Sequence, residues 1–346
     1  MTALTSALPL AITMGDPAGI GPEIILKSFI QQPEWMKNCV VVGDIAVMRQ
    51  HAQLLGLSLE FKSIESTAQA HTVQAAIPVL QTGPTAHIEL GLVSAVAGRM
   101  AADAVIWAAQ AALRGEVAGV VTAPLHKKAL SLAGIPHPGH TELLQSLAAE
   151  HLGLSENELP VRMMLTSPGL STVLVSIHVS LRQAIDAVTQ AQVLQTLQIT
   201  HRSWQQLHGH SPRMVVAGLN PHAGEDGLFG LEEINEIAPA IAQAQQMGMT
   251  VSGPYPPDTV FMDAHSASGQ STTDVVIAMY HDQGLIPVKY LGLEHGVNQT
   301  LGLPFVRTSP DHGTAFDIAG RGLANPSSLL AAIKVARGER LNQRLS

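Results

Sequence analysis

Three histidines stand where apolar, strand-forming runs of the chain give way to turns: His178, His222 and His281. If these runs are neighbouring strands of one sheet, their ends converge and the three imidazoles could face one point. Neutral imidazoles with an open coordination position suit Zn²⁺, Co²⁺ or another divalent ion that acts on a substrate. The ligands come from far apart in the sequence, so an ordinary set of polar turns after core strands stays open as the alternative.

The stretch around the third histidine carries the most chemistry. His281 and Asp282 follow the apolar run 275–280, and Lys289 comes eight residues after His281. Gly284 and Pro287 predict a turn between them. A metal-type donor, a carboxylate and an ammonium group thus follow a buried strand, and ligands of open α/β sheets bind outside the carboxyl ends of strands.

A second set of residues could bind an anionic substrate: His140, Thr141, Lys289, Asn298 and Arg307. The first two lie in a loop rich in proline and glycine, where Thr141 is expected to cap a helix over 142–151. A helix N-terminus can hold a phosphate through its free N–H groups, and arginine binds phosphate through its planar fork. Surface ion pairs and simple caps are the alternative for each residue.

Two glycine-rich segments could bring the backbone close to a ligand. The first, 15–23, joins a strand to a helix, but its glycine spacing is neither the dinucleotide fingerprint nor a P-loop. The second, 311–326, has short side chains that would let the backbone approach a flat ligand.

Strands and helices are expected to alternate along the chain, which indicates an α/β fold with a largely parallel core sheet. The expected strands are 10–14, 39–43, 75–80, 117–122, 162–165, 171–177, 213–217 and 275–279. The expected helices are 23–30, 45–55, 92–113, 142–151, 181–197, 232–247 and 327–337.

Length and composition indicate a globular chain of two domains. With 346 residues it exceeds one comfortable core, and we place the limits at 1–125 plus 305–346 for the first domain and 126–304 for the second. Hydrophobic residues make up 46% and aromatic residues only 3%, so the core is aliphatic, as in parallel sheets covered by helices.

Charge and cysteine content exclude several partners. The net charge of −8 argues against nucleic acid, because phosphate contacts need clustered Lys and Arg. We expect no membrane partner, since no uninterrupted apolar stretch of about 18 residues occurs. Cys39 is the only cysteine and the N-terminus has no secretory pattern, which together predict a reducing, cytoplasmic location.

Several segments resemble the 4-hydroxythreonine-4-phosphate dehydrogenase (PdxA) family. The most specific are Pro138-Gly139-His140-Thr141-Glu142, the 220–225 segment Asn-Pro-His-Ala-Gly-Glu, the 280–284 segment Tyr-His-Asp-Gln-Gly, and 302–309. The likeness runs from residue 12 to about 325. It implies a fold like the isocitrate and isopropylmalate dehydrogenases, with the active site in the cleft between two domains. It also implies a homodimer whose interface lies in the second domain and whose sites are shared across subunits.

The resemblance also assigns roles to residues. It implies that His178, His222 and His281 bind one divalent metal (Zn, Co or Mg), and that His140, Thr141, Lys289, Asn298 and Arg307 bind a phosphorylated substrate. Lys289 and Asp282 become candidates for proton transfer. NAD or NADP would contact His312, Gly313, Thr314, Asp317 and Asn325, and Asp317 would favour NAD over NADP.

The implied reaction is oxidation with β-decarboxylation of 4-phosphooxy-L-threonine to 3-amino-2-oxopropyl phosphate, in pyridoxal phosphate synthesis. Segments 226–230 and 256–261 look closer to a branch that acts on 4-phospho-D-threonate or erythronate. A third branch oxidises a cis-dihydrodiol of terephthalate but departs from the 139–142 loop that this chain keeps. A metal-dependent isomerase or a non-catalytic sugar-phosphate binder is the alternative from another class, and the segment 312–325 argues against it.

Overall fold

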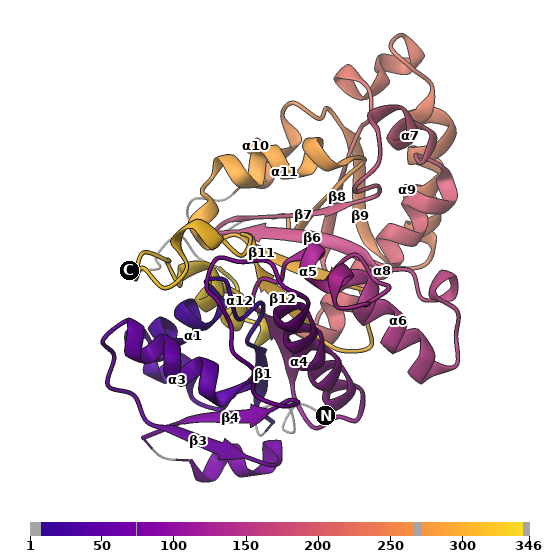
Figure 1. The fold of residues 1–346 in the computed structure, drawn as a ribbon. Helices are drawn as coiled ribbons and strands as arrows, with labels where there is room; N and C mark the ends of the chain where they lie inside the picture. The colour runs from indigo at the N-terminus through magenta and orange to yellow at the C-terminus, as the bar shows by residue number, and fades with distance from the viewer. Residues whose placement is uncertain (1–7, 74, 266–271, 342–346) are drawn as a thin grey trace. The chain divides into compact units, whose positions relative to one another are not determined.

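The computed structural model describes residues 8–73, 75–265 and 272–341 of the chain, in which strands are interspersed with helices (Figure 1). The predicted α/β fold class is therefore confirmed. The chain divides into two compact units, Met1–Leu159 with Leu303–Arg337 and Pro160–Gly302 with Gly338–Ser346. This division groups 126–159 with the first unit, where α6 packs against α4; the predicted domain limits themselves stay a prediction.

The first unit is built on parallel strands, which are buried on both faces except at the edge strand β3. Their order is β3 (Phe61–Ile64), β4 (Ile77–Gln81), β2 (Cys39–Gly43), β1 (Leu10–Thr13), β5 (Gly119–Thr122) and β12 (Arg307–Pro310). The helices are α1 (Gly21–Gln31), α2 (Pro33–Met36), α3 (Ile45–Leu54), α4 (Ala95–Leu113), α5 (Lys127–Leu132), α6 (His140–Leu152) and α12 (Ser327–Ala336). Short 3₁₀ turns lie at η1 (Thr67–Thr72), η2 (Glu156–Glu158) and η6 (Phe316–Ile318). Helices α3 and α4 begin where the side chains of Asp44 and Ser94 accept hydrogen bonds from N–H groups of the first turn.

The second unit has a mixed sheet. Its order is β11 (Val297–Leu301), β6 (Arg162–Ser167), β7 (Leu170–Leu174), β10 (Val275–Ala278), β8 (Arg213–Ala217) and β9 (Thr250–Tyr255). Strand β6 runs antiparallel to β11 and β7, whereas β7, β10, β8 and β9 pair in parallel. The helical segments are α7 (Leu181–Asp186), α8 (Gln190–His208), η3 (Pro221–Gly227), the π-helix η4 (Glu233–Ile237), α9 (Ala238–Gln246), α10 (Val260–Ala264), α11 (His281–Tyr290) and η5 (Leu293–His295).

Two expected elements are corrected by the structure. The helix expected over 181–197 is two helices, because the Thr189 side chain accepts a hydrogen bond from Gln192 N and so starts α8 anew. The turn expected within 281–289 is the helix α11, with Pro287 inside it. Gly284 allows this helix to approach β7, since a Cβ at that position would collide with Leu174.

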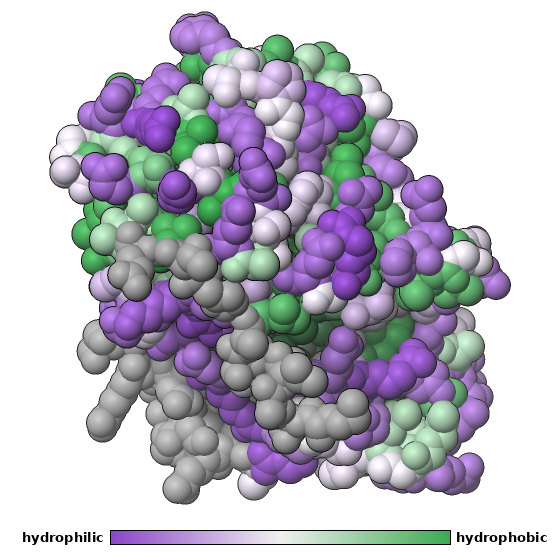
Figure 2. All heavy atoms as spheres, turned by 90° about the horizontal axis from the view of Figure 1, so that it is seen from below, coloured by the Kyte–Doolittle hydropathy of each residue, from purple (hydrophilic) through white to green (hydrophobic). Residues whose placement is uncertain are grey.

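The surface is mixed in polarity. Hydrophobic residues lie scattered among hydrophilic ones on the face drawn in Figure 2. Among the residues described, no helix has both the length and the apolar character that crossing a membrane requires.

Close packing of α4 against α5 depends on Gly98, which is buried in the first turn of α4. A Cβ at this position would collide with the backbone carbonyl of Ala129. In an exposed helix, Gly→Ala adds about 1 kcal/mol of stability. Here we expect Gly98→Ala to lower the free energy of unfolding by about 1–3 kcal/mol, because the backbones must separate.

Urea denaturation followed by circular dichroism measures this change. Gln110→Ala, at an exposed position of the same helix, is the control and should leave stability nearly unchanged. A Gly98→Ala protein more stable than wild type would show that α4 and α5 do not need this close approach.

Candidate active site

The strands that precede the three histidines are direct neighbours, in the order β7, β10, β8. Ala278 of β10 pairs with Leu174 of β7, and Ile277 pairs with Val216 of β8, in parallel register. Their carboxyl ends therefore lie along one edge of the sheet. The imidazoles of His178 and His281 come together there, with ring centroids 5.5 Å apart and an interplanar angle of 43°.

His222 lies apart from this pair, on η3 after β8. Its ring contacts Phe229, at 6.0 Å between centroids. The residues from His222 to Asp226 all have positive φ, a conformation that non-glycine residues adopt rarely and at a cost. Across the described ranges, no three His, Cys, Asp or Glu side chains gather closely enough to hold a metal ion. The structure thus brings together two of the three predicted ligands.

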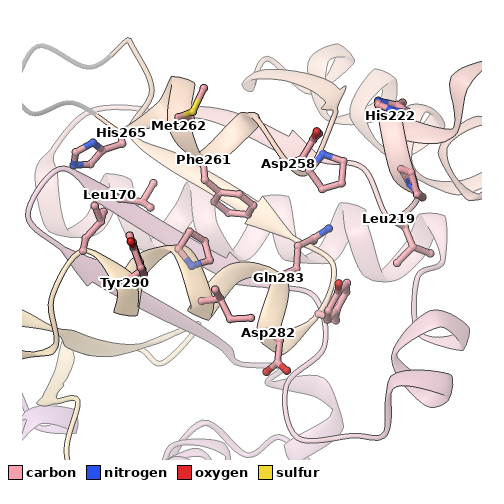
Figure 3. A pocket seen from close by; sticks show the side chains of 16 residues that line it. Leu170, Leu219, His222, Asp258, Phe261, Met262, His265, Asp282, Gln283 and Tyr290 are labelled. Carbon is pink, nitrogen blue, oxygen red and sulfur yellow. The ribbon is translucent and has the colours of Figure 1, made fainter.

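A cavity of about 880 Å³ lies beside these segments. Its walls are mainly apolar, and Figure 3 shows Phe261, Met262 and Leu219 among the side chains that line it. His222 and Asp282 are also part of the wall. Asp282 Oδ1 lies 2.7 Å from Nδ1 of His281, so the carboxylate is positioned to orient that imidazole.

The other predicted residues of the second unit lie on α11 and β11. Lys289 is exposed on the last turn of α11, two turns after His281. Asn298 is partly buried on β11, paired with Leu165 of β6.

In the first unit, the predicted anion-binding residues gather around Arg307. This residue begins β12, is 5% exposed, and donates a hydrogen bond from Nη2 to Thr122 Oγ1 at 2.8 Å. His140 and Thr141 are the first two residues of α6. The N-cap is Gly139, in an extended conformation, so the expectation that Thr141 caps this helix is wrong. Both residues instead stand at the N-terminus of α6, where the first N–H groups have no partner within the helix and can bind an anion.

Burial and charge set the protonation of this cluster. Burial, followed by the positive charge of Arg307, lowers the pKa of His140 well below 6.5. Burial also lowers the pKa of Arg307 to about 10, against the opposing influence of Glu142. At neutral pH the cluster therefore presents a neutral imidazole beside a charged guanidinium, which suits an anionic group.

The predicted dinucleotide-binding residues lie in a loop between β12 and α12. Asp317 is exposed on η6, and Asn325 accepts hydrogen bonds from Ser327 at the start of α12. Thr314 is buried and its carbonyl accepts a hydrogen bond from Ile20 N at 3.0 Å. His312 and Gly313 contact each other through His312 Nδ1 and the Gly313 carbonyl, at 3.0 Å.

Four residues that sequence reasoning did not single out hold these segments in place. Lys27 donates to its neighbour Glu23 and to the carbonyls of Gly322 and Ala324, while Glu23 accepts from Ala324 N. In the second unit, buried Glu233 accepts hydrogen bonds from the segment before His222, and Gln283 bonds to that segment as well. Apart from the Lys27–Glu23 pair, their partners lie 13 or more positions away in the sequence, so no local pattern could have revealed them.

The lowered pKa of His140 predicts a pH dependence of stability. The unfolded chain binds a proton on this imidazole below about pH 6.5, whereas the folded chain resists it. The stabilising contribution is therefore fully present above that pH and is lost as the pH falls below it. Calorimetry at pH of about 7.5 and 5.5 should show a smaller fall in Tm for His140→Gln than for wild type.

His151→Gln, at an exposed position of the same helix, is the control and should keep the wild-type pH dependence. An unchanged pH dependence in the His140→Gln protein would show that His140 is not kept neutral by its surroundings.

Comparisons with known proteins identify relatives of the whole chain. The family described as "Pyridoxal phosphate biosynthetic protein PdxA" matches residues 35–336. A 4-hydroxythreonine-4-phosphate dehydrogenase of Beijerinckia indica is 50% identical over 329 residues, covering 95% of this chain and 94% of the relative. A D-threonate 4-phosphate dehydrogenase of Salmonella typhimurium is 44% identical over 331 residues, covering 94% and 97%. A crystal structure of 4-hydroxythreonine-4-phosphate dehydrogenase from Klebsiella pneumoniae has a TM-score of 0.84 and 42% identity, covering 95% of this chain and 98% of that chain.

Proposed function

The chain belongs to the PdxA family of pyridoxal phosphate biosynthetic proteins, and on this premise we propose that it oxidises and decarboxylates 4-phosphooxy-L-threonine with NAD(P). The product would be 3-amino-2-oxopropyl phosphate. The observation that carries the proposal is the buried, charged Arg307 grouped with His140 at the N-terminus of α6. A buried positive charge at a helix N-terminus is suited to a phosphate group.

In the proposed complex, residues of the first unit hold the phosphate. Arg307 supplies charge-assisted hydrogen bonds, and neutral His140 adds a bond without bringing a second charge. Thr141 contributes its hydroxyl and its N–H at the start of α6. Lys289 and Asn298 are the residues of the second unit that we assign to the same substrate.

We assign the divalent metal (zinc, cobalt or magnesium) to His178, His222 and His281. The donor set fits such an ion, because two imidazoles are adjacent and the third follows the strand next to them. Asp282 would orient His281 through its bond to Nδ1. A metal held by these imidazoles would supply Lewis-acid polarisation of the substrate hydroxyl, and a bound nicotinamide would supply the hydride acceptor.

The proton balance of the proposed reaction requires first a base and then an acid from the protein. Oxidation breaks the substrate O–H and C–H bonds, so one proton must be taken up as the alcohol becomes a ketone. Loss of CO₂ from the β-keto acid then requires a proton at the adjacent carbon. Lys289 and Asp282 are exposed groups of α11 that we assign to these transfers.

The dinucleotide is assigned to the loop of His312, Gly313, Thr314, Asp317 and Asn325. The exposed carboxylate of Asp317 favours NAD, because it would repel the additional phosphate of NADP. Clamping of this loop by Glu23 and Lys27 supports a binding role, since a clamped loop loses little entropy when a ligand binds. We further propose that the protein acts in the cytoplasm as a homodimer.

A second candidate substrate is 4-phospho-D-threonate, or its erythronate isomer. It is favoured by the D-threonate 4-phosphate dehydrogenase that is 44% identical to this chain. Both substrates carry a phosphate and a carboxylate beside a secondary alcohol, so the same residues would serve either. The difference would lie at the amino or hydroxyl group of C2.

Substrate identity is tested by NADH formation at 340 nm with purified protein and Zn²⁺, Co²⁺ or Mg²⁺. We expect turnover of 4-phosphooxy-L-threonine with kcat/KM at least about tenfold above that of the two sugar-acid phosphates. The reverse order would move the enzyme to sugar-acid catabolism. No turnover of any phosphorylated substrate would contradict the phosphate role of Arg307.

The metal assignment is tested by His222→Ala. We expect this variant to lose turnover and to bind Zn²⁺ more weakly by at least about a hundredfold in calorimetric titration, since one of three ligands is removed. The fold should remain, because His222 is exposed. His210→Ala, which removes an exposed histidine of the same unit, is the control. Wild-type zinc affinity in His222→Ala would exclude the three-histidine site.

A further inference from the structure

One side chain links the backbone segments that precede two of the three histidines. Gln283 Oε1 accepts a hydrogen bond from Met279 N at 2.6 Å, two residues before His281. Gln283 Nε2 donates to the Gly218 carbonyl at 2.7 Å, four residues before His222. Figure 3 shows Gln283 extending from the helix of Asp282 toward the segment of Leu219.

Met279 also bonds to the backbone segment that precedes His178. The Met279 carbonyl accepts hydrogen bonds from Ser176 N at 3.2 Å and from Ser176 Oγ at 3.0 Å. Ser176 stands two residues before His178. Met279 is therefore bonded on one side to the His178 segment and, through Gln283, on the other side to the His222 segment.

Beyond Gly218, the His222 segment is held by Glu233. Its carboxylate accepts hydrogen bonds from Leu219 N at 2.7 Å and from Asn220 N at 2.8 Å. Gln283 and Glu233 thus bond to three consecutive residues, 218 to 220. The bonds of Gln283 connect this stretch with the segment of His281.

We propose that Gln283 is a positioning residue that sets the spacing between the His222 and His281 segments and thereby determines the affinity for the metal ion. This inference rests on the proposed three-histidine site. A glutamine suits the task because its amide has one donor and one acceptor, and the two backbone partners require one of each. Removing either bond lets the loop of His222 move relative to His281.

The test is the dissociation constant of Zn²⁺ and Co²⁺ for the full chain, measured by calorimetry without substrate. Gln283→Leu removes both bonds at similar volume, and we expect affinity to fall about tenfold to a hundredfold. The visible absorption of bound Co²⁺ should also change, because the ligand geometry changes. Gln283→Asn is too short to span both partners and should weaken binding in the same direction if the leucine variant does not fold.

Ser176→Ala offers a graded comparison. It removes the hydroxyl bond to Met279 but keeps the bond from Ser176 N, so we expect a smaller loss of affinity than for Gln283→Leu. Gln245→Leu is the matched control: Gln245 Nε2 also donates to a backbone carbonyl, that of Val251, at 2.8 Å in the same unit. This variant should keep wild-type affinity and the wild-type Co²⁺ spectrum.

The outcomes separate the two hypotheses. If the wild-type protein binds neither ion, the metal site fails and the inference fails with it. If wild type binds metal and the folded Gln283 variants bind equally well with an unchanged Co²⁺ spectrum, the metal site stands and the role of Gln283 is refuted. A loss of affinity equal to that of Gln245→Leu would also refute it, because a general loss of stability would then explain the effect.

Discussion

Parallel pairing of β7, β10 and β8 is the constraint on which the candidate metal site depends. Hydrogen bonds continue beyond the strand ends, from Val175 N to Ala278 O at 2.9 Å and from Ser176 N to Met279 O. Adjacent strands lie about 4.8 Å apart, so residues just past paired ends stay close together. The ring separation of 5.5 Å between His178 and His281 follows from this spacing. Two imidazoles are therefore placed by the sheet itself.

In the first unit, burial determines the protonation of Arg307 and His140. Taking an arginine out of water costs several kcal/mol unless its N–H groups and charge are compensated. Arg307 keeps a pKa of about 10 despite its burial, so it stays charged at neutral pH. The pKa of His140 moves in the direction that avoids a second positive charge. One fixed cation beside a neutral imidazole can bind an anionic phosphate without the internal repulsion that two cations would have when the site is empty.

The sequence allowed the α/β class and the strand ends before His178, His222 and His281 to be predicted, because apolar runs and their polar terminations are local signals. It failed where glycine and proline serve tertiary packing. Gly284 and Pro287 suggested a turn, yet Gly284 lies in a helix and permits its approach to Leu174. The bonds of Gln283 and Glu233 could not be predicted, since they join residues up to 65 positions apart. The sequence pattern also predicted that the three histidines converge. It could not predict the backbone conformation of the segment that carries His222.

The backbone conformation at His222 explains why the three predicted ligands differ. The imidazoles of His178 and His281 are placed by the sheet, whereas the position of His222 depends on the groups that hold its loop. Non-glycine residues with positive φ cost of order 1–3 kcal/mol where the backbone is strained, and His222, Ala223, Glu225 and Asp226 are all of this kind. These residues belong to the 3₁₀ segment η3 and not to a strand. Their conformation is held by Glu233, which bonds to Leu219 and Asn220 and lies so near Gly224 that a Cβ there would come within 2.7 Å of its Oε2. A ligand on such a loop responds to the groups that anchor it. Polar anchors, rather than the sheet, therefore control how readily the third imidazole can join the other two.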